Sequence, residues 1–107
     1  MTEKKYIYNL TEEKLIERIV DDENIHLNHM VLTKGTSLPE HYSNSNVYMI
    51  IVRGIMTLQL NEQEAHQYAK GEIVNIPYNT KMNVHNLDEA VLEFFVVKSP
   101  NPKNYKE

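Results

Sequence analysis

The sequence predicts an all-β domain, either a sandwich or a barrel. Its apolar residues fall in short runs rich in Val, Ile, Tyr and Phe, and turn-forming residues separate the runs. Its length of 107 residues fits one small domain and leaves no room for a second. We expect strands over residues 6–10, 25–33, 47–54, 55–60, 72–77, 81–86 and 90–97.

The segment at residues 11–20 fits two structures. Its apolar residues, at positions 15, 16, 19 and 20, share one face of a helix that Thr11 would cap. The same segment also fits the first arm of a β-hairpin that turns at residues 21–24. The local pattern favours the helix slightly, and our choice of a strand rests on the family resemblance given below.

Two of the expected strands are apolar at nearly every position. Residues 47–52 read VYMIIV and residues 91–97 read VLEFFVV. A strand with this pattern is covered on both faces. In a small barrel one face lines the interior, so the other face needs a second layer, either the N-terminal segment or another copy of the chain. We therefore expect a homodimer.

Composition excludes several classes of partner. Acidic residues outnumber basic ones by 15 to 11, and the basic residues are scattered, so we expect no binding to nucleic acid or to a membrane surface. The chain has no cysteine, which excludes disulfides, thiolate nucleophiles and cysteine metal sites and fits a reducing cytoplasm. We see no signal peptide or membrane span and expect a cytoplasmic protein.

The middle of the chain contains two sets of residues at characteristic spacings. The first contains Gly35, then His41, Tyr42 and Ser43, then Val47 and Gly54. The second contains Gly71, then Pro77, Tyr78 and Asn79, then Met82 and Asn86. In spacing they resemble the two motifs of small single-domain cupins, over about residues 25–97.

The resemblance implies a cupin-type jelly-roll β-barrel. It makes residues 1–107 one cupin domain with a core at about 25–97, N-terminal strands within 5–24 and a C-terminal tail at 98–107. We expect the tail to be frayed or draped over the surface, because it contains two prolines and little to bury.

The resemblance places the four cupin metal ligands at His41, Ser43, Val47 and Met82. Only His41 keeps an imidazole. A serine hydroxyl is a weak ligand, valine has no lone pair, and a thioether prefers Cu(I) to the divalent ions that cupins use. We therefore predict that the barrel holds no metal and no other cofactor.

The register of the two motifs also predicts an interior site. Alternate residues on a strand share a face, so Met49 and Ile51 continue the inward face of Val47, and Val84 continues that of Met82. Such an apolar lumen is typical of a small-molecule pocket and equally of a filled barrel core. The expected ligand-binding residues are His29, His41, Ser43, Val47, Met49, Ile51, Met82 and Val84.

The other histidines have simpler interpretations. His29 shares a face with Leu27 and Val31, so it would point into the barrel near His41; we favour a hydrogen-bonded core or interface histidine. His85 lies on the opposite face from Met82 and belongs at the surface, unless a bulge turns it inward.

These observations leave competing functions. The first is a metal-free, non-catalytic sensor, carrier or accessory module that binds a small, largely apolar or neutral molecule in the barrel. The second is a metal-independent isomerase-like or epimerase-like enzyme with His41 as its general base. The third is a structural homodimer without a ligand. A metal site rebuilt around His29 and His41 ranks last.

Overall fold

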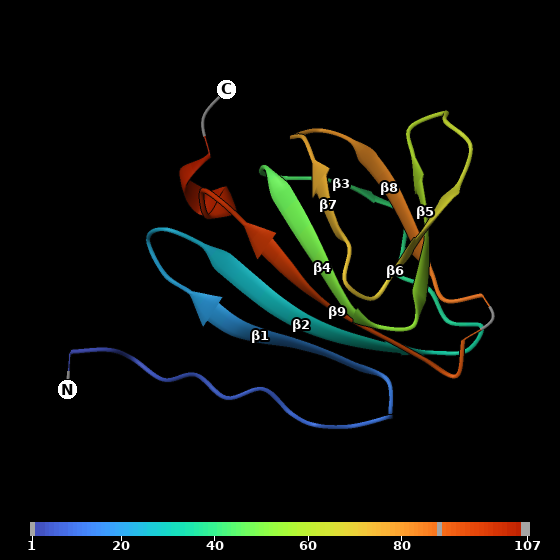
Figure 1. Ribbon diagram of the computed structural model, residues 1–107. Helices are drawn as coiled ribbons and strands as arrows, with labels where there is room; N and C mark the ends of the chain where they lie inside the picture. Colours follow the sequence, from blue (N-terminus) through green and yellow to red (C-terminus); the bar gives the residue numbers. More distant parts are fainter. Residues whose placement is uncertain (1, 88, 106–107) are drawn as a thin grey trace.

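The computed structural model describes residues 2–87 and 89–105 and folds into two antiparallel sheets (Figure 1). This confirms the all-β prediction. None of the described residues forms a helix with the length and apolar character needed to cross a membrane. The described elements are β1 (Leu15–Asp21), β2 (His26–Thr33), β3 (His41–Tyr42), β4 (Val47–Arg53), β5 (Ile55–Leu60), β6 (His66–Ala69), β7 (Ile73–Ile76), β8 (Lys81–His85), β9 (Val91–Lys98) and the 3₁₀ helix η1 (Pro102–Asn104).

The two sheets pack face to face as a jelly-roll barrel. Sheet A has five strands in the order β1-β2-β9-β4-β7, and sheet B has four in the order β3-β8-β5-β6. Figure 1 shows the last long strand, β9, lying between β2 and β4 in sheet A. The hydrophobic core lies between the sheets and draws on both of them. Its largest buried side chains include Leu32, Met49, Ile51, Met56, Leu58, Ile76, Met82, Leu92 and Phe94.

Most of the predicted strands are present. The strands β2, β4, β5, β7 and β8 lie within the predicted ranges 25–33, 47–54, 55–60, 72–77 and 81–86, and β9, predicted at 90–97, extends one residue further to Lys98. The ambiguous segment forms β1, so the choice of a strand over a helix is confirmed. The turn into β2 is fixed by the Asp22 carboxylate, which accepts the N–H groups of Asn24 and Ile25 at 2.8 and 2.9 Å. Pairing along β2 therefore outweighs the local helical pattern.

Three details differ from the predictions. Residues 6–10 are not in a strand, so of the strands expected within residues 5–24 only β1 forms. The strands β3 and β6 were not predicted, because they are short and largely polar and carry little strand signal. Their sheet partners, β8 and β5, supply the pairing that their own sequences do not indicate.

Alternation in β4 separates the two faces of sheet A. Val47, Met49 and Ile51 are buried in the core, whereas Tyr48 and Ile50 point to the outer face, as the register predicted. Each large side chain buried in this way contributes roughly 1.5–3 kcal/mol through removal from water.

The turns of the two cupin-like motifs contain residues in the left-handed backbone conformation. Gly54 has φ +82°, and a Cβ atom there would lie 2.2 Å from the Val91 carbonyl oxygen. Only glycine fits at this close approach. Asn79, which stands where the cupin motif has glycine, has φ 61°. Asparagine tolerates this left-handed conformation better than most residues with a side chain.

The C-terminal tail is packed rather than frayed up to residue 105; residues 106 and 107 lie outside the described part. Asn101 is buried, and its Nδ2 donates to Asp21 Oδ1 at 2.7 Å and to the carbonyl oxygens of Asp22 and Ile25 at 2.9 and 3.1 Å. The Tyr105 ring stacks on Tyr78 with centroids 4.3 Å apart. One asparagine therefore ties the tail to the β1–β2 turn.

We predict that Asn101→Ala lowers the free energy of unfolding by about 1–3 kcal/mol, because the backbone carbonyls lose a buried donor. The Asn101 amide also holds the pKa of Asp21 below its ordinary value. The stability that the ionised Asp21 carboxylate gains from this hydrogen bond is fully present above about pH 4. It is lost as the pH falls through the pKa that Asp21 has in the folded state. In urea unfolding, the difference between wild type and variant should therefore narrow in acid and persist in part, because the carbonyl bonds do not titrate.

Asn104→Ala is the control for this prediction, since the Asn104 side chain makes an exposed bond to the Glu23 carbonyl. An equal loss of stability in both variants would contradict the role assigned to Asn101.

Candidate functional site

The four positions that bind metal in cupins are occupied by a turn and by the core. His41 is exposed, and its Nδ1 lies 2.8 Å from the Pro39 carbonyl, to which it donates. Ser43 is buried; its hydroxyl donates to the Pro77 carbonyl at 2.6 Å and accepts the Thr80 N–H at 2.8 Å. Val47 and Met82 are packed in the hydrophobic core.

This donor set does not fit a divalent metal ion. The Ser43 hydroxyl is already committed to two backbone groups, and His41 offers a single imidazole at the surface. Within residues 2–87 and 89–105, no three His, Cys, Asp or Glu side chains are grouped so as to hold a metal. Neither His29 nor His85 therefore rebuilds a site there.

The interior positions fill the barrel. Val47, Met49, Ile51, Met82 and Val84 all face inward, as expected, and all belong to one hydrophobic cluster with exposed fractions of 2% or less. The structure gives these side chains a packing role, which was the second interpretation of an apolar lumen. A ligand-binding role for them stays a prediction.

His29 lies on the outer face of sheet A, not in the barrel. Its neighbours in β2, Met30 and Leu32, face the core, so the predicted direction toward His41 is wrong. The ring is fully buried: Nδ1 lies 2.7 Å from Glu17 Oε2, and Nε2 lies 2.6 Å from Glu93 Oε2. The interpretation as a hydrogen-bonded buried histidine is confirmed.

The two carboxylates hold the His29 ring in one orientation, because each ring nitrogen faces one carboxylate oxygen. Burial raises the pKa of Glu17, but hydrogen bonds from Asn9 and His29 outweigh burial and leave that pKa below its ordinary value. The hydrogen bonds to Glu17 are thus charge-assisted.

The N-terminal segment covers this trio. The Tyr8 ring lies 4.7 Å from the His29 ring and meets Phe95 edge-on at 5.0 Å. Asn9 donates to the Glu17 carboxylate from its backbone N–H at 3.0 Å and from Nδ2 at 2.7 Å. Burial of Glu17, His29 and Glu93 therefore depends on residues that precede β1.

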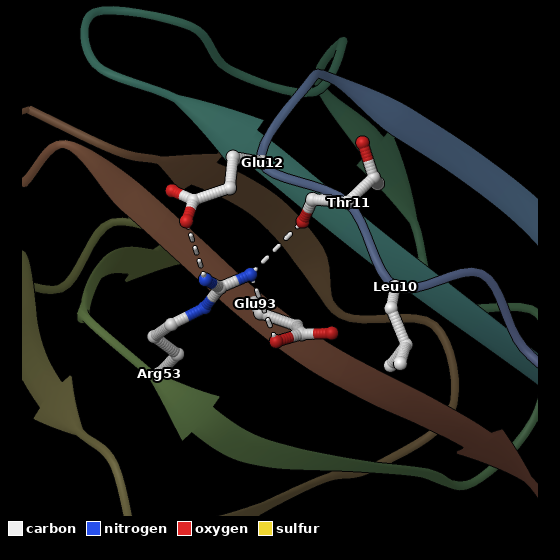
Figure 2. A pocket seen from close by; sticks show the side chains of 5 residues that line it. All are labelled: Leu10, Thr11, Glu12, Arg53 and Glu93. Atoms are coloured by element: carbon white, nitrogen blue, oxygen red, sulfur yellow. Dashed lines mark hydrogen bonds and ion pairs between the residues drawn. The ribbon is translucent and has the colours of Figure 1, made fainter.

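The network continues into an open pocket (Figure 2). Arg53 Nη2 lies 3.1 Å from the second Glu93 oxygen and donates to the Thr11 carbonyl at 3.0 Å, and Nη1 lies 3.7 Å from Glu12 Oε1. These four residues and Leu10 line a pocket of about 470 Å³. Sequence reasoning missed it because none of them carries a motif. The one available signal was Glu93, a carboxylate inside an otherwise apolar strand.

We predict that His29→Ala lowers the free energy of unfolding by about 3–5 kcal/mol, because it empties the space of a fully buried ring and removes one hydrogen-bond partner from each of Glu17 and Glu93. Chemical denaturation measures this loss. His66→Ala, at an exposed histidine, should stay within about 0.5 kcal/mol of wild type. A similarly small change for His29→Ala would contradict a stabilising role for the hydrogen-bonded trio.

We further predict that protein purified without a histidine tag carries less than about 0.1 equivalent of any transition metal, because the cupin ligand positions lack suitable donors. Elemental analysis by mass spectrometry tests this, and a near-stoichiometric metal content would refute it.

Comparisons with known proteins agree with this architecture. No protein-family model matches the chain. An uncharacterised protein of Methanocaldococcus jannaschii is 47% identical over 104 residues, which cover 96% of this chain and 90% of that protein. The crystal structure of an RmlC-like cupin family protein from the same organism has a TM-score of 0.93 at 47% identity and covers 96% of this chain and 95% of that chain.

A cupin-like protein of Thermotoga maritima shares the fold, with a TM-score of 0.74 at 20% identity over 79% of this chain and 67% of that chain. The M. jannaschii structure is described as a double-stranded β-helix, which is the arrangement of sheets A and B here. Given 47% identity over nearly the whole of both chains, this chain belongs to the RmlC-like cupin family.

Proposed function

We propose that this cupin is a metal-free, non-catalytic module that binds a small neutral molecule in the pocket beside Arg53, on the outer face of sheet A. The observation that carries the proposal is the hydrogen-bonded chain from Glu17 through His29 and Glu93 to Arg53. It gives the pocket a polar wall whose orientation is set before any ligand arrives, which reduces the cost of binding.

The charges around the pocket favour a neutral ligand. Two carboxylates, Glu12 and Glu93, face one guanidinium, so an anion gains little there. The Arg53 side chain is 39% exposed, and among the described residues its Nη1 makes only the 3.7 Å contact with Glu12, which leaves a guanidinium donor for a carbonyl or hydroxyl oxygen. Leu10, largely exposed at the pocket, offers a contact for an apolar part of the molecule.

The pocket also has a suitable size. Sites for small molecules usually enclose about 300–1,000 Å³, and this one has about 470 Å³. The barrel interior is filled by side chains. We therefore place the ligand of a sensor, carrier or accessory module outside the barrel instead of within it.

Nothing in the described geometry favours the isomerase-like or epimerase-like alternative. A general base needs a second polar group within hydrogen-bond reach of the substrate. The nearest candidate by strand position, Ser43, has its hydroxyl engaged with Pro77 and Thr80. His41 itself is exposed and bonded to the Pro39 carbonyl.

We predict that neutral amide and alcohol fragments, screened one at a time by two-dimensional amide NMR, perturb the resonances of Leu10, Thr11, Arg53 and Glu93. Arg53→Met should weaken binding of a fragment hit at least about tenfold, because it removes the donor that anchors the oxygen. Arg18→Met is the matched control, since Arg18 is an exposed arginine on β1 that does not line the pocket.

Perturbations confined to Met49, Met82 and Val84 would instead place the ligand in the barrel. The absence of any saturable perturbation across the library would count against a binding module as such.

A further inference from the structure

A second, much smaller pocket lies on the outer face of sheet B, the face that points away from the core. Figure 1 shows its central strand, β5, between β6 and β8. The pocket has a volume of about 30 Å³, which suits a group of about the size of a water molecule and excludes a ring. The residues that line this sheet B pocket come from β5, β6 and the loop after β8: Ile55, Thr57, Gln67, Leu87 and Glu89.

Thr57 brings a hydroxyl without a protein partner to the sheet B pocket. Its neighbours along β5, Met56 and Leu58, face the core, so Thr57 faces the opposite way. The residue is only 8% exposed, yet its side chain makes no hydrogen bond with any residue in 2–87 or 89–105. Buried hydroxyls in folded proteins nearly always have a partner, so this one is available to a bound group.

The polar groups around Thr57 are uncommitted as well. Strand pairing places Gln67 directly opposite Thr57 on β6, with both side chains on the same face of the sheet. Within the part of the chain that the structure describes, neither the Gln67 amide nor the Glu89 carboxylate makes a side-chain hydrogen bond or an ion pair. The sheet B pocket therefore offers three oxygen acceptors, from a hydroxyl, an amide and a carboxylate.

Asn86 holds the loop that supplies the other wall. Its side chain is buried, and Nδ2 donates to the carbonyl oxygens of Leu32 and Glu89 at 2.8 and 2.9 Å. Its Oδ1 accepts the Glu89 N–H at 3.1 Å. The backbone of Glu89 is thus fixed before any ligand arrives, which reduces the cost of binding.

We propose that the sheet B pocket binds the ammonium end of an alkylamine. An ammonium group has three N–H donors and no acceptor, which matches the acceptors of Thr57, Gln67 and Glu89. The apolar side chains of Ile55 and Leu87 provide contacts for the alkyl chain.

The charge of the lining favours a cation over a neutral alcohol or an anion. Glu89 is acidic, and no Lys or Arg lines the sheet B pocket. The same ammonium chemistry is present in a small free amine and in the Lys side chain of a peptide. Amine binding here does not depend on the proposed function, because the two pockets share no residue.

Titration of the full chain with n-butylammonium chloride at constant ionic strength, followed by two-dimensional amide NMR, tests this site. We expect saturable perturbations at Thr57, Gln67, Leu87 and Glu89. The neutral isostere n-butanol should bind at least about tenfold more weakly, because it lacks the charge and two of the three donors. A parallel titration with Nα-acetyl-lysine N-methylamide distinguishes the two sources: binding of both amines admits a Lys side chain, and binding of n-butylammonium alone restricts the site to free amines.

Two variants with a matched control test the acceptors. Glu89→Gln should weaken n-butylammonium binding at least about tenfold, because it removes the charged acceptor. Glu64→Gln removes the same charge at an exposed residue in the β5–β6 loop and should weaken binding by less than about twofold. Thr57→Val should weaken binding about threefold to tenfold. It should leave the urea midpoint of the ligand-free protein unchanged or higher, because the hydroxyl has no protein partner to lose.

Equal weakening by Glu89→Gln and Glu64→Gln would mean that the amine responds only to the overall negative charge of the protein, and it would overturn the site. Equal binding of n-butanol, or no saturable perturbation at the lining residues, overturns it too. A lower urea midpoint for Thr57→Val would show that the hydroxyl has a structural partner and is not a free acceptor. Each of these results is separate from the screen of neutral fragments, which monitors the pocket beside Arg53.

Discussion

Sheet A must be covered on both faces, and the rest of the structure follows from that constraint. Its central strands, β2, β9 and β4, carry apolar side chains toward the core and away from it. Sheet B covers the inner face, and the segment before β1, residues 8–11, covers part of the outer one. The polar groups between this segment and sheet A are tolerated there because each has a hydrogen-bond or ion-pair partner.

The cupin fold is present here, but a turn and the hydrophobic core occupy the positions that bind metal in cupins. Gly54 and Asn79 still form the sharp turns of the two motifs, and Ser43 now uses its hydroxyl to join them. The interior has become an apolar core. Polar groups are concentrated instead on the opposite side of the same sheet, where Glu93 connects the buried His29 to the pocket.

The strands with alternating or continuous apolar patterns could be located from sequence, because side-chain period and turn residues are local properties. The family resemblance correctly placed a strand at β1, where the local pattern favoured a helix. The direction of His29 could not be predicted, since it depends on how β2 sits between the two layers. The pocket was equally invisible, because Thr11, Arg53 and Glu93 are far apart in sequence and meet only after sheet A has formed.

The position of β9 has a consequence for how the chain is made. The central strand of sheet A is β9, so the sheet cannot form completely until residues 91–98 are available. Strands β2 and β4 each pair with β9 and not with each other. During synthesis, the first 90 residues would leave the ribosome with two apolar strands still lacking their common neighbour. Sheet A must therefore close late and as a unit, and strand pairing of this long range is intrinsically slow. Until β9 has been synthesised, the apolar side chains of β2 and β4 lack the neighbouring strand that completes their sheet.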